Sequence, residues 1–327
     1  MTYEEFKIAM TEAVTNLVGE EVKVSLHRIS KNNGVILDAI TVMEGDQNMA
    51  PTIYLKDYYF RYRRGSRIEE LAEELLDYTR KNSRRGKVPE HYFTDFSQVK
   101  KRICFKLVNY EKNKDLLATV PHRKMMDLAM VFYFSMDPAV MERATALIRD
   151  EDMERWGTNE AEIRRLAMEN TPRMLKWRLA TVSELLQDML DLEIEGECCS
   201  PFMIGLEETN PFPMHVLTNE EKYFGAACMF YPGLLRQISE KFNDNLYVLP
   251  SSIHECIIVP ASGNHTRKSL SELVTEINEI QVEETEFLAD NAYFYNRETR
   301  TLSTWEPEDM QYMDQGNEAN IQVVLNC

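Results

Sequence analysis

The chain has few of the patterns that mark nucleotide-binding and membrane proteins. Its 327 residues include only 12 glycines, and neither G-x-G-x-x-G nor G-x-x-x-x-G-K-[ST] occurs, so no phosphate-binding loop is visible. No apolar run approaches the roughly 20 residues that a membrane span needs. The start, Met1-Thr2-Tyr3-Glu4-Glu5-Phe6, lacks the basic and apolar parts of a signal peptide. We therefore expect a cytoplasmic protein that does not contact a membrane.

Cysteine and histidine lack the spacing of metal sites. The six cysteines form no C-x-x-C pair, and the adjacent Cys198 and Cys199 are poorly placed to form a disulfide or to chelate one metal. The six histidines are dispersed, with neither H-x-x-x-H nor H-E-x-x-H spacing. The sequence thus predicts reduced thiols, no metal and no cofactor, and it places Cys228 and Cys256 in the core as small hydrophobic residues.

Charge is abundant but unevenly distributed. The formal net charge of −17 argues against general affinity for nucleic acid or anionic membranes. Residues 56–124, however, carry 18 Lys and Arg against 10 Asp and Glu, an excess of +8, which leaves −25 for the remainder. This segment is either a basic face for an acidic protein or nucleic acid, or a surface that complements the acidic part of the protein itself.

Hydrophobic periodicity predicts helices alternating with strands. In the first part we expect a helix over 3–18 with a capping box of Thr2 and Glu5, a hairpin of 21–29 and 35–43, and a helix over 66–81 with a second box of Ser66 and Glu69. Further on we expect strands at 103–110 and 128–134, a helix over 158–170 ended by Thr171-Pro172, a strand at 224–230, a helix at 233–242, strands 246–249 and 256–259, a helix at 268–281 and a hairpin at 292–304.

These elements predict an α+β fold with mixed or largely antiparallel sheets flanked by helices, in two subdomains. An acidic segment rich in proline and glycine interrupts the pattern near residue 200. The expected organisation is an N-terminal subdomain at 1–192, a linker or insertion at 193–213, a C-terminal subdomain at 214–304 and an acidic tail at 305–327.

Pro250-Ser251-Ser252-Ile253-His254-Glu255 brings a hydroxyl, an imidazole and a carboxylate together between two apolar runs. On a strand, Ser252 and His254 would share one face about 6 to 7 Å apart, and Glu255 would point away. A triad within this hexapeptide therefore fails on geometry, and an acid such as Asp127 would have to orient His254. The alternative is that Pro-Ser-Ser forms a turn and that His254 satisfies buried polar groups.

Two other groups of residues are candidates for binding. The segment Tyr54 to Arg64 combines aromatic and basic side chains, which suit either single-stranded nucleic acid or a helix packed on a sheet. The binding residues predicted from this segment and from the basic loop after it are Tyr58, Tyr62, Arg63, Arg64, Arg84, Arg85 and Lys87. Polar residues that either line a pocket or cap turns and helix ends are Asn109, Asn113, His122 and Asn170.

Several phrases carry a family resemblance, and they run in order along nearly the whole chain: Lys31-Asn32-Asn33-Gly34-Val35, Pro51-Thr52-Ile53-Tyr54-Leu55, Leu107-Val108-Asn109-Tyr110-Glu111-Lys112-Asn113, Val120-Pro121-His122, Asp127-Leu128-Ala129, Glu169-Asn170-Thr171-Pro172 and Leu249-Pro250-Ser251-Ser252-Ile253-His254-Glu255. Together they resemble a family of intracellular proteins from anaerobic, largely gut-dwelling bacteria, number fifty-six eighty-eight in the series of domains of unknown function. The resemblance implies an α+β protein and implies no reaction, cofactor or catalytic residue.

Three functional hypotheses follow from the sequence. The first is a non-enzymatic binding or regulatory protein that uses the basic 56–124 surface against an acidic protein or nucleic acid. The second is a hydrolase-like enzyme built on Ser252 and His254 with an acid such as Asp127. The third is a structural component of a larger assembly, which would expose a large apolar patch.

Overall fold

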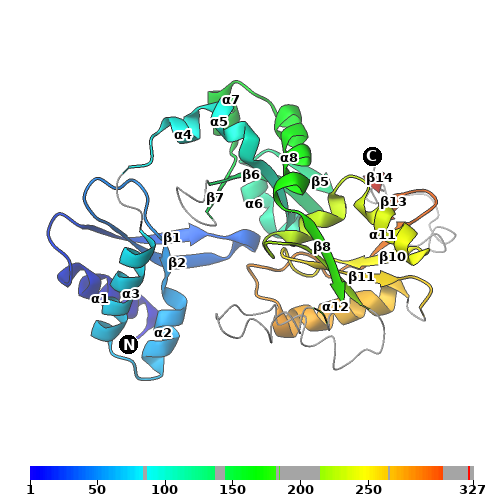
Figure 1. The fold of residues 1–327 in the computed structure, drawn as a ribbon. Helices are drawn as coiled ribbons and strands as arrows, with labels where there is room; N and C mark the ends of the chain where they lie inside the picture. The colour runs from blue at the N-terminus through cyan, green and yellow to red at the C-terminus, as the bar shows by residue number, and fades with distance from the viewer. Residues whose placement is uncertain are drawn as a thin grey trace. The chain divides into compact units, whose positions relative to one another are not determined.

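The fold is α+β, as the sequence predicts, with open and mostly antiparallel sheets. A computed structural model describes residues 1–83, 87–136, 144–181, 184, 214–263, 266–304 and 323–324 (Figure 1). The chain divides into two compact units. The first contains Met1–Val99 and Met136–Ala144, and the second contains Lys100–Ser135 and Thr145–Cys327.

The first unit is a three-stranded sheet with three main helices. Its elements are α1 (Tyr3–Asn16), β1 (Lys23–Ser30), η1 (Asn32–Gly34), β2 (Ile36–Met43), β3 (Ile53–Tyr54), α2 (Leu55–Arg63), α3 (Ile68–Asn82), α4 (His91–Thr94) and α5 (Phe96–Val99). The predicted hairpin is confirmed, with Lys23 opposite Met43 and Ser30 opposite Ile36. The predicted capping box of α1 is also confirmed, because Thr2 and Glu5 each accept the other's backbone N–H.

The core of the first unit lies between the helices and the hairpin. In Figure 1 the helices α1, α2 and α3 gather beside β1 and β2. The amphipathic spacing of α1 and α3 buries one side of each helix. The fully buried contributors include Phe6 and Met10 of α1, Ile40 of β2, and Leu71 and Leu75 of α3.

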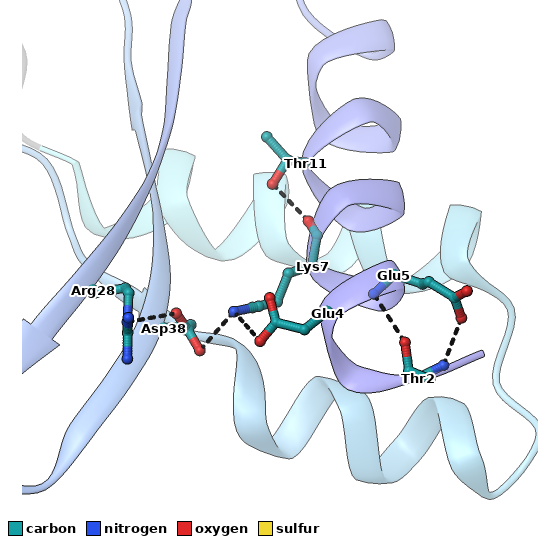
Figure 2. A network of polar contacts seen from close by, with 7 residues as sticks. All are labelled: Thr2, Glu4, Glu5, Lys7, Thr11, Arg28 and Asp38. Carbon is teal, nitrogen blue, oxygen red and sulfur yellow. Dashed lines mark hydrogen bonds and ion pairs between the residues drawn. The ribbon is translucent and has the colours of Figure 1, made fainter.

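One charged side chain is buried with this core. Lys7 of α1 is 6% exposed, and its Nζ lies 2.9 Å from Glu4 and 3.1 Å from Asp38 of β2 (Figure 2). Burial alone would lower the pKa of Lys7, but the hydrogen bonds with Glu4 and Asp38 outweigh it and raise the pKa. The pair therefore links α1 to the hairpin.

The second unit begins with a small antiparallel sheet. Its strands are β4 (Ile103–Asn109), β5 (His122–Met125), β6 (Leu128–Ser135) and β7 (Thr145–Leu147). The short helix η2 (Lys100–Arg102) precedes β4, and η3 (Glu111–Asn113) and α6 (Lys114–Leu117) lie between β4 and β5 in sequence. Strand β6 pairs with β4, β5 and β7. The prediction that 128–134 forms a central strand is confirmed.

Helix α8 (Glu160–Met174), which follows α7 (Asp150–Trp156), covers the free edge of β4. The Asn170 amide donates to the carbonyls of Lys100 and Ile103 at 2.9 and 3.0 Å, and the Thr171 hydroxyl accepts from the Phe105 N–H at 3.0 Å. The prediction that Pro172 ends the helix is wrong, because the helix continues to Met174. These edge contacts hold the last turn in place although Pro172 provides no N–H.

The larger sheet of the second unit has the order β14-β13-β12-β10-β11-β9-β8. Its strands are β8 (Trp177–Thr181), β9 (His215–Asn219), β10 (Leu246–Leu249), β11 (Cys256–Pro260), β12 (Tyr293–Asn296), β13 (Thr301–Ser303) and β14 (Val323–Val324). The predicted strand pair around 250–255 and the late hairpin are confirmed. Strands β8 and β9 pair antiparallel, with Thr181 opposite His215.

Three helical segments accompany this sheet: η4 (Gly225–Phe230), α11 (Leu234–Phe242) and α12 (Arg267–Gln281). Helix α12 runs along the sheet (Figure 1) and packs Leu270 and Val274 against Tyr247 and Ile257. The predicted helices at 233–242 and 268–281 are thus confirmed.

The strand predicted at 224–230 is wrong, because these residues form the buried 3-10 helix η4. The turn before η4 has positive φ at Lys222 (50°) and Phe224 (55°) and is held by the Asn219 side chain, which bonds both backbone groups of Tyr223. A Cβ on Gly225 would lie 2.1 Å from Thr218 Oγ1 and 2.3 Å from the His254 carbonyl oxygen. The close packing of this turn therefore requires glycine.

The chain passes from one compact unit to the other after Val99, after Ser135 and after Ala144. The predicted linker at 193–213 lies outside the described residues, and so does the tail except for the pairing of β14 with β13. The boundaries proposed from the sequence therefore stay a prediction. Among the helices of the described part of the chain, none combines the length and the apolar character required to cross a bilayer.

Candidate binding surface on helix α2

Helix α2 buries its tyrosines on one side. Tyr58, Tyr59 and Tyr62 pack against the core of the first unit and are half-buried. The Phe6 ring centroid lies 5.3 Å from that of Tyr59 and 5.4 Å from that of Tyr62. At 3.6 residues per turn these positions share one side of the helix. This side of α2 is thus a structural face.

The opposite side of α2 presents an exposed aromatic ring with three cations and one carboxylate around it. Phe60 is 54% exposed, and its neighbours one turn away are Lys56 and Asp57 on one end and Arg63 and Arg64 on the other. Lys56 and Arg64 take part in no ion pair among the described residues. The Arg63 guanidinium donates to the Tyr59 hydroxyl at 3.4 Å. We call Lys56, Phe60, Arg63 and Arg64 the α2 outer face.

Arg61 differs from the arginines of the outer face because α3 neutralises it. Its guanidinium donates two hydrogen bonds to the Glu74 carboxylate, at 2.6 and 2.5 Å. The bond from Arg61 lowers the pKa of Glu74, and burial followed by the Glu74 charge raises the pKa of Tyr58. Arg61 therefore joins α2 to α3 rather than remaining available to a partner.

The end of α2 explains why the second predicted capping box is absent. Gly65 has φ +107°, its N–H donates to Tyr62, and the Ser66 N–H donates to Arg61, which is the pattern of a Schellman motif. Because Ser66 closes α2, helix α3 starts at Ile68 with Arg67 as its N-cap and without a side-chain cap. Glu69, expected to complete the box, pairs with Arg67 at 3.5 Å. The predicted Ser66 box is wrong.

An open pocket of about 560 Å³ lies at this corner between α2 and α3. It shares Arg63 with the α2 outer face and adds the guanidinium of Arg67 and the hydroxyl of Ser66. The full lining is Met1, Tyr62, Arg63, Gly65, Ser66, Arg67, Ile68 and Glu69. Arg67 is paired with Glu69 of the same lining at 3.5 Å, so the pocket adds a neutralised pair rather than further positive charge to the outer face.

The structure separates the predicted binding residues. Tyr58 and Tyr62 face the core, Arg63 and Arg64 are exposed on α2, and Lys87 is exposed elsewhere in the unit. Arg84 and Arg85 lie outside the described residues. Sequence reasoning missed Phe60, Lys56 and Arg67. A helical wheel would have indicated Phe60, because it lies two residues from both Tyr58 and Tyr62 and therefore on the other side of the helix.

The basic excess of residues 56–124 falls mostly on the second unit. Residues 56–99 carry 10 basic against 8 acidic side chains, and residues 100–124 carry 8 against 2. Three lysines of the latter part lie over aromatic rings, Lys106 over Phe224, Lys112 over Phe287 and Lys124 over Tyr110, at 4.3, 4.1 and 4.1 Å. Among the described strands, β5 lies at an edge of its sheet. Charged side chains such as Lys124 prevent another strand from pairing with such an edge. Structural roles thus account for much of this charge.

His254 is engaged through both ring nitrogens. Its Nδ1 accepts from the Phe224 N–H at 3.3 Å, and its Nε2 lies 3.5 Å from the Glu286 carboxylate. The Ser252 hydroxyl accepts instead from the backbone N–H of His254, at 3.0 Å. The hydrogen bond from His254 lowers the pKa of Glu286. In this arrangement neither ring nitrogen of His254 is available to take a proton from Ser252.

Asp127, the acid proposed to orient His254, contacts other residues. It accepts from the Tyr293 hydroxyl and, at 2.8 Å, from the Asn291 amide. Burial and the nearby Asp127 charge raise the pKa of Tyr293. The orienting carboxylate of His254 is Glu286, which no local pattern in the sequence indicates because it lies in a distant loop.

The other polar candidates bond to backbone groups. Asn109 donates to the Leu288 carbonyl at 2.9 Å and Asn113 donates to the Asn109 carbonyl at 2.8 Å. His122 Nδ1 lies 3.0 Å from the Val120 carbonyl, and Asn170 holds the edge of β4 as described above. These contacts are with backbone carbonyls at turns and at strand edges, whereas the alternative given from the sequence is that the residues cap turns and helix ends.

Burial keeps the three cysteine thiols in the described part of the chain in the protonated form. Burial raises the pKa of Cys104 to about 11 and that of Cys228 to about 12, and Cys256 shifts in the same direction. Such thiols stay protonated at neutral pH. Cys228 and Cys256 are buried as the sequence predicts.

A family model matches residues 3–297, which is most of the chain. The chain belongs to the family of unknown function DUF5688. This confirms the family resemblance carried by the phrases between Lys31 and Glu255. No curated protein and no solved structure matches this family member. Membership in the family assigns no activity, so the functional argument rests on the residues of the chain.

Proposed function

We propose that this protein is a cytoplasmic, non-enzymatic binding protein that holds an acidic macromolecule on the α2 outer face. The observation that carries the proposal is the exposure of Phe60, 54%, between Lys56 on one side and Arg63 and Arg64 on the other. The other aromatic residues of α2 pack in the core, and Arg61 is held by Glu74. The outer face thus keeps its apolar ring and its cations for contact outside the unit.

The energetics favour association at this face. Burying a fully exposed large apolar side chain contributes about 1.5 to 3 kcal/mol, and Phe60, which is 54% exposed, has about half of that to gain. The flanking guanidinium groups add charge complementarity, which speeds association with an acidic partner and selects it. Arginine and aromatic residues are also the types that most often dominate binding energy at interfaces.

The test compares the full-length chain with R63E/R64E, a double variant that reverses two charges of the outer face. Lys81→Glu is the matched control, because Lys81 is exposed on the neighbouring helix α3. The probes are labelled polyglutamate and an oligothymidylate strand, followed by fluorescence anisotropy at low and physiological salt. We expect the wild type and the control to bind at least one probe and R63E/R64E to lose at least about tenfold in affinity. Equal binding by all three proteins, or none by any, would refute the proposal.

A further inference from the structure

We infer that the α2 outer face binds an acidic segment of another protein, with one hydrophobic residue of that segment on Phe60, rather than single-stranded nucleic acid. The inference rests on the proposed function and specifies the partner. It follows from the length of the face, the charges that border it and the number of aromatic rings that it offers.

The outer face is short. Helix α2 has nine residues, so it is about 14 Å long. An extended peptide advances roughly 3.3 to 3.6 Å per residue, so about four residues cover this length. Domains that bind single-stranded nucleic acid contact about 4 to 16 nucleotides along one groove, which is a longer path than a four-residue peptide occupies. The face therefore fits a short peptide better than a nucleic-acid strand.

Acidic side chains border the face. Glu74 reaches α2 through Arg61, and Glu70 and Asp77 lie on the same stripe of α3 by helical spacing. All three are exposed. A phosphate backbone that continued in this direction would meet negative charge. A short acidic peptide can end before it reaches this stripe.

The face also offers a single ring. Single-strand binders stack successive bases on successive aromatic side chains, whereas Tyr58, Tyr59 and Tyr62 are packed against the core. One exposed ring matches one hydrophobic anchor.

The spacing of the cations predicts the sequence pattern of the partner. Lys56 and Arg64 are each four residues from Phe60, which corresponds to about 6 Å along the axis. In an extended partner this distance is about two residues. The expected pattern is acid-x-apolar-x-acid, with the carboxylates on Lys56 and on Arg63 or Arg64.

The experiment uses the full chain and three probes: a labelled peptide containing Glu-Ser-Phe-Ser-Glu, the same peptide with serine in place of phenylalanine, and oligothymidylate. We expect the phenylalanine peptide to bind best and the serine peptide to bind about tenfold more weakly. Phe60→Ala should remove this difference between the peptides, and Phe60→Leu should retain most of it. Circular dichroism establishes that each variant is folded.

The outcomes separate the two proposals. If oligothymidylate binds more tightly than either peptide and its binding requires Phe60 and Arg63, the acidic-peptide inference is overturned while the binding function stands. If the two peptides bind equally, the role of Phe60 as an anchor is overturned. If no probe distinguishes the wild type from R63E/R64E, both proposals fail.

Discussion

Replacing the buried Lys7 by methionine tests the account of the first unit most directly. The substitution keeps the apolar stem and removes the ammonium group that lies 3.1 Å from Asp38 (Figure 2). The Asp38 side chain is only 12% exposed, and Arg28 is 4.0 Å away and itself largely in solvent. Lys7→Met thus leaves a nearly buried carboxylate without its closest cation.

The expected cost follows from this geometry. Removing one partner of a buried ion pair costs about 3 to 5 kcal/mol. Asp38 keeps Arg28, whose Nε lies 4.0 Å from its carboxylate, so we expect the lower part of that range or slightly less, about 2 to 3 kcal/mol. This corresponds to roughly a 30- to 150-fold change in the local opening equilibrium. The double variant K7M/D38L should recover most of the loss, because a well-packed apolar pair replaces the ion pair.

Hydrogen exchange of the full chain, measured on peptides that cover α1 and β2, is the appropriate assay. Tryptophan fluorescence would not report on this unit, because the three tryptophans, Trp156, Trp177 and Trp305, all lie outside Met1–Val99. Lys23→Met, an exposed lysine of β1, is the matched control. If Lys7→Met and Lys23→Met exchange alike, or if the double variant is as unstable as Lys7→Met, the buried pair does not hold α1 to the hairpin.

Three further predictions concern single positions. Gly225→Ala should destabilise the second unit by about 1 to 3 kcal/mol, because the added Cβ would overlap the His254 carbonyl and Thr218. The control is Gly19→Ala, which should be nearly neutral because nothing lies within 4 Å of the added Cβ. Thermal unfolding of the two variants measures the difference. Ser66→Ala should leave the melting temperature nearly unchanged, since the Ser66 side chain does not cap α3. A decrease of about 1 kcal/mol in the free energy of unfolding, which is typical of a lost N-cap, would contradict the assignment of Arg67 as the N-cap of α3. The hydrogen bond from His254 lowers the folded-state pKa of Glu286 below 4.5. The stability that this pair contributes is therefore present above pH 4.5 and is lost as the pH falls through the folded pKa. Glu286→Gln should reduce this acid sensitivity when unfolding is measured as a function of pH.

The sequence predicts the elements that depend on neighbouring residues. Thr2 and Glu5 lie three residues apart and form the box that starts α1, and Asn33 and Gly34 supply the positive φ that the first hairpin turn requires. Elements that depend on distant contacts are predicted less well. Pro172 should end a helix by local rules, yet the edge of β4 holds the last turn of α8 through Asn170 and Thr171.

The candidate surface is partly readable from the sequence. The composition of Tyr54 to Arg64 indicates an aromatic and basic helix, and helical spacing alone places Phe60 opposite Tyr58 and Tyr62. The neutralisation of Arg61 is not readable, because Glu74 comes from another helix whose packing no local rule fixes. His254 has the same limit, since its partner Glu286 lies in a loop that follows α12.

The pairing of β8 with β9 has a consequence for how this chain can change in length. Thr181 and His215 are directly opposite each other, so the stretch from 182 to 214 leaves and re-enters the sheet at adjacent points, as a hairpin loop does. A foreign domain whose own termini lie close together therefore meets the geometric requirement for insertion between β8 and β9, because the two attachment points are paired residues of one sheet.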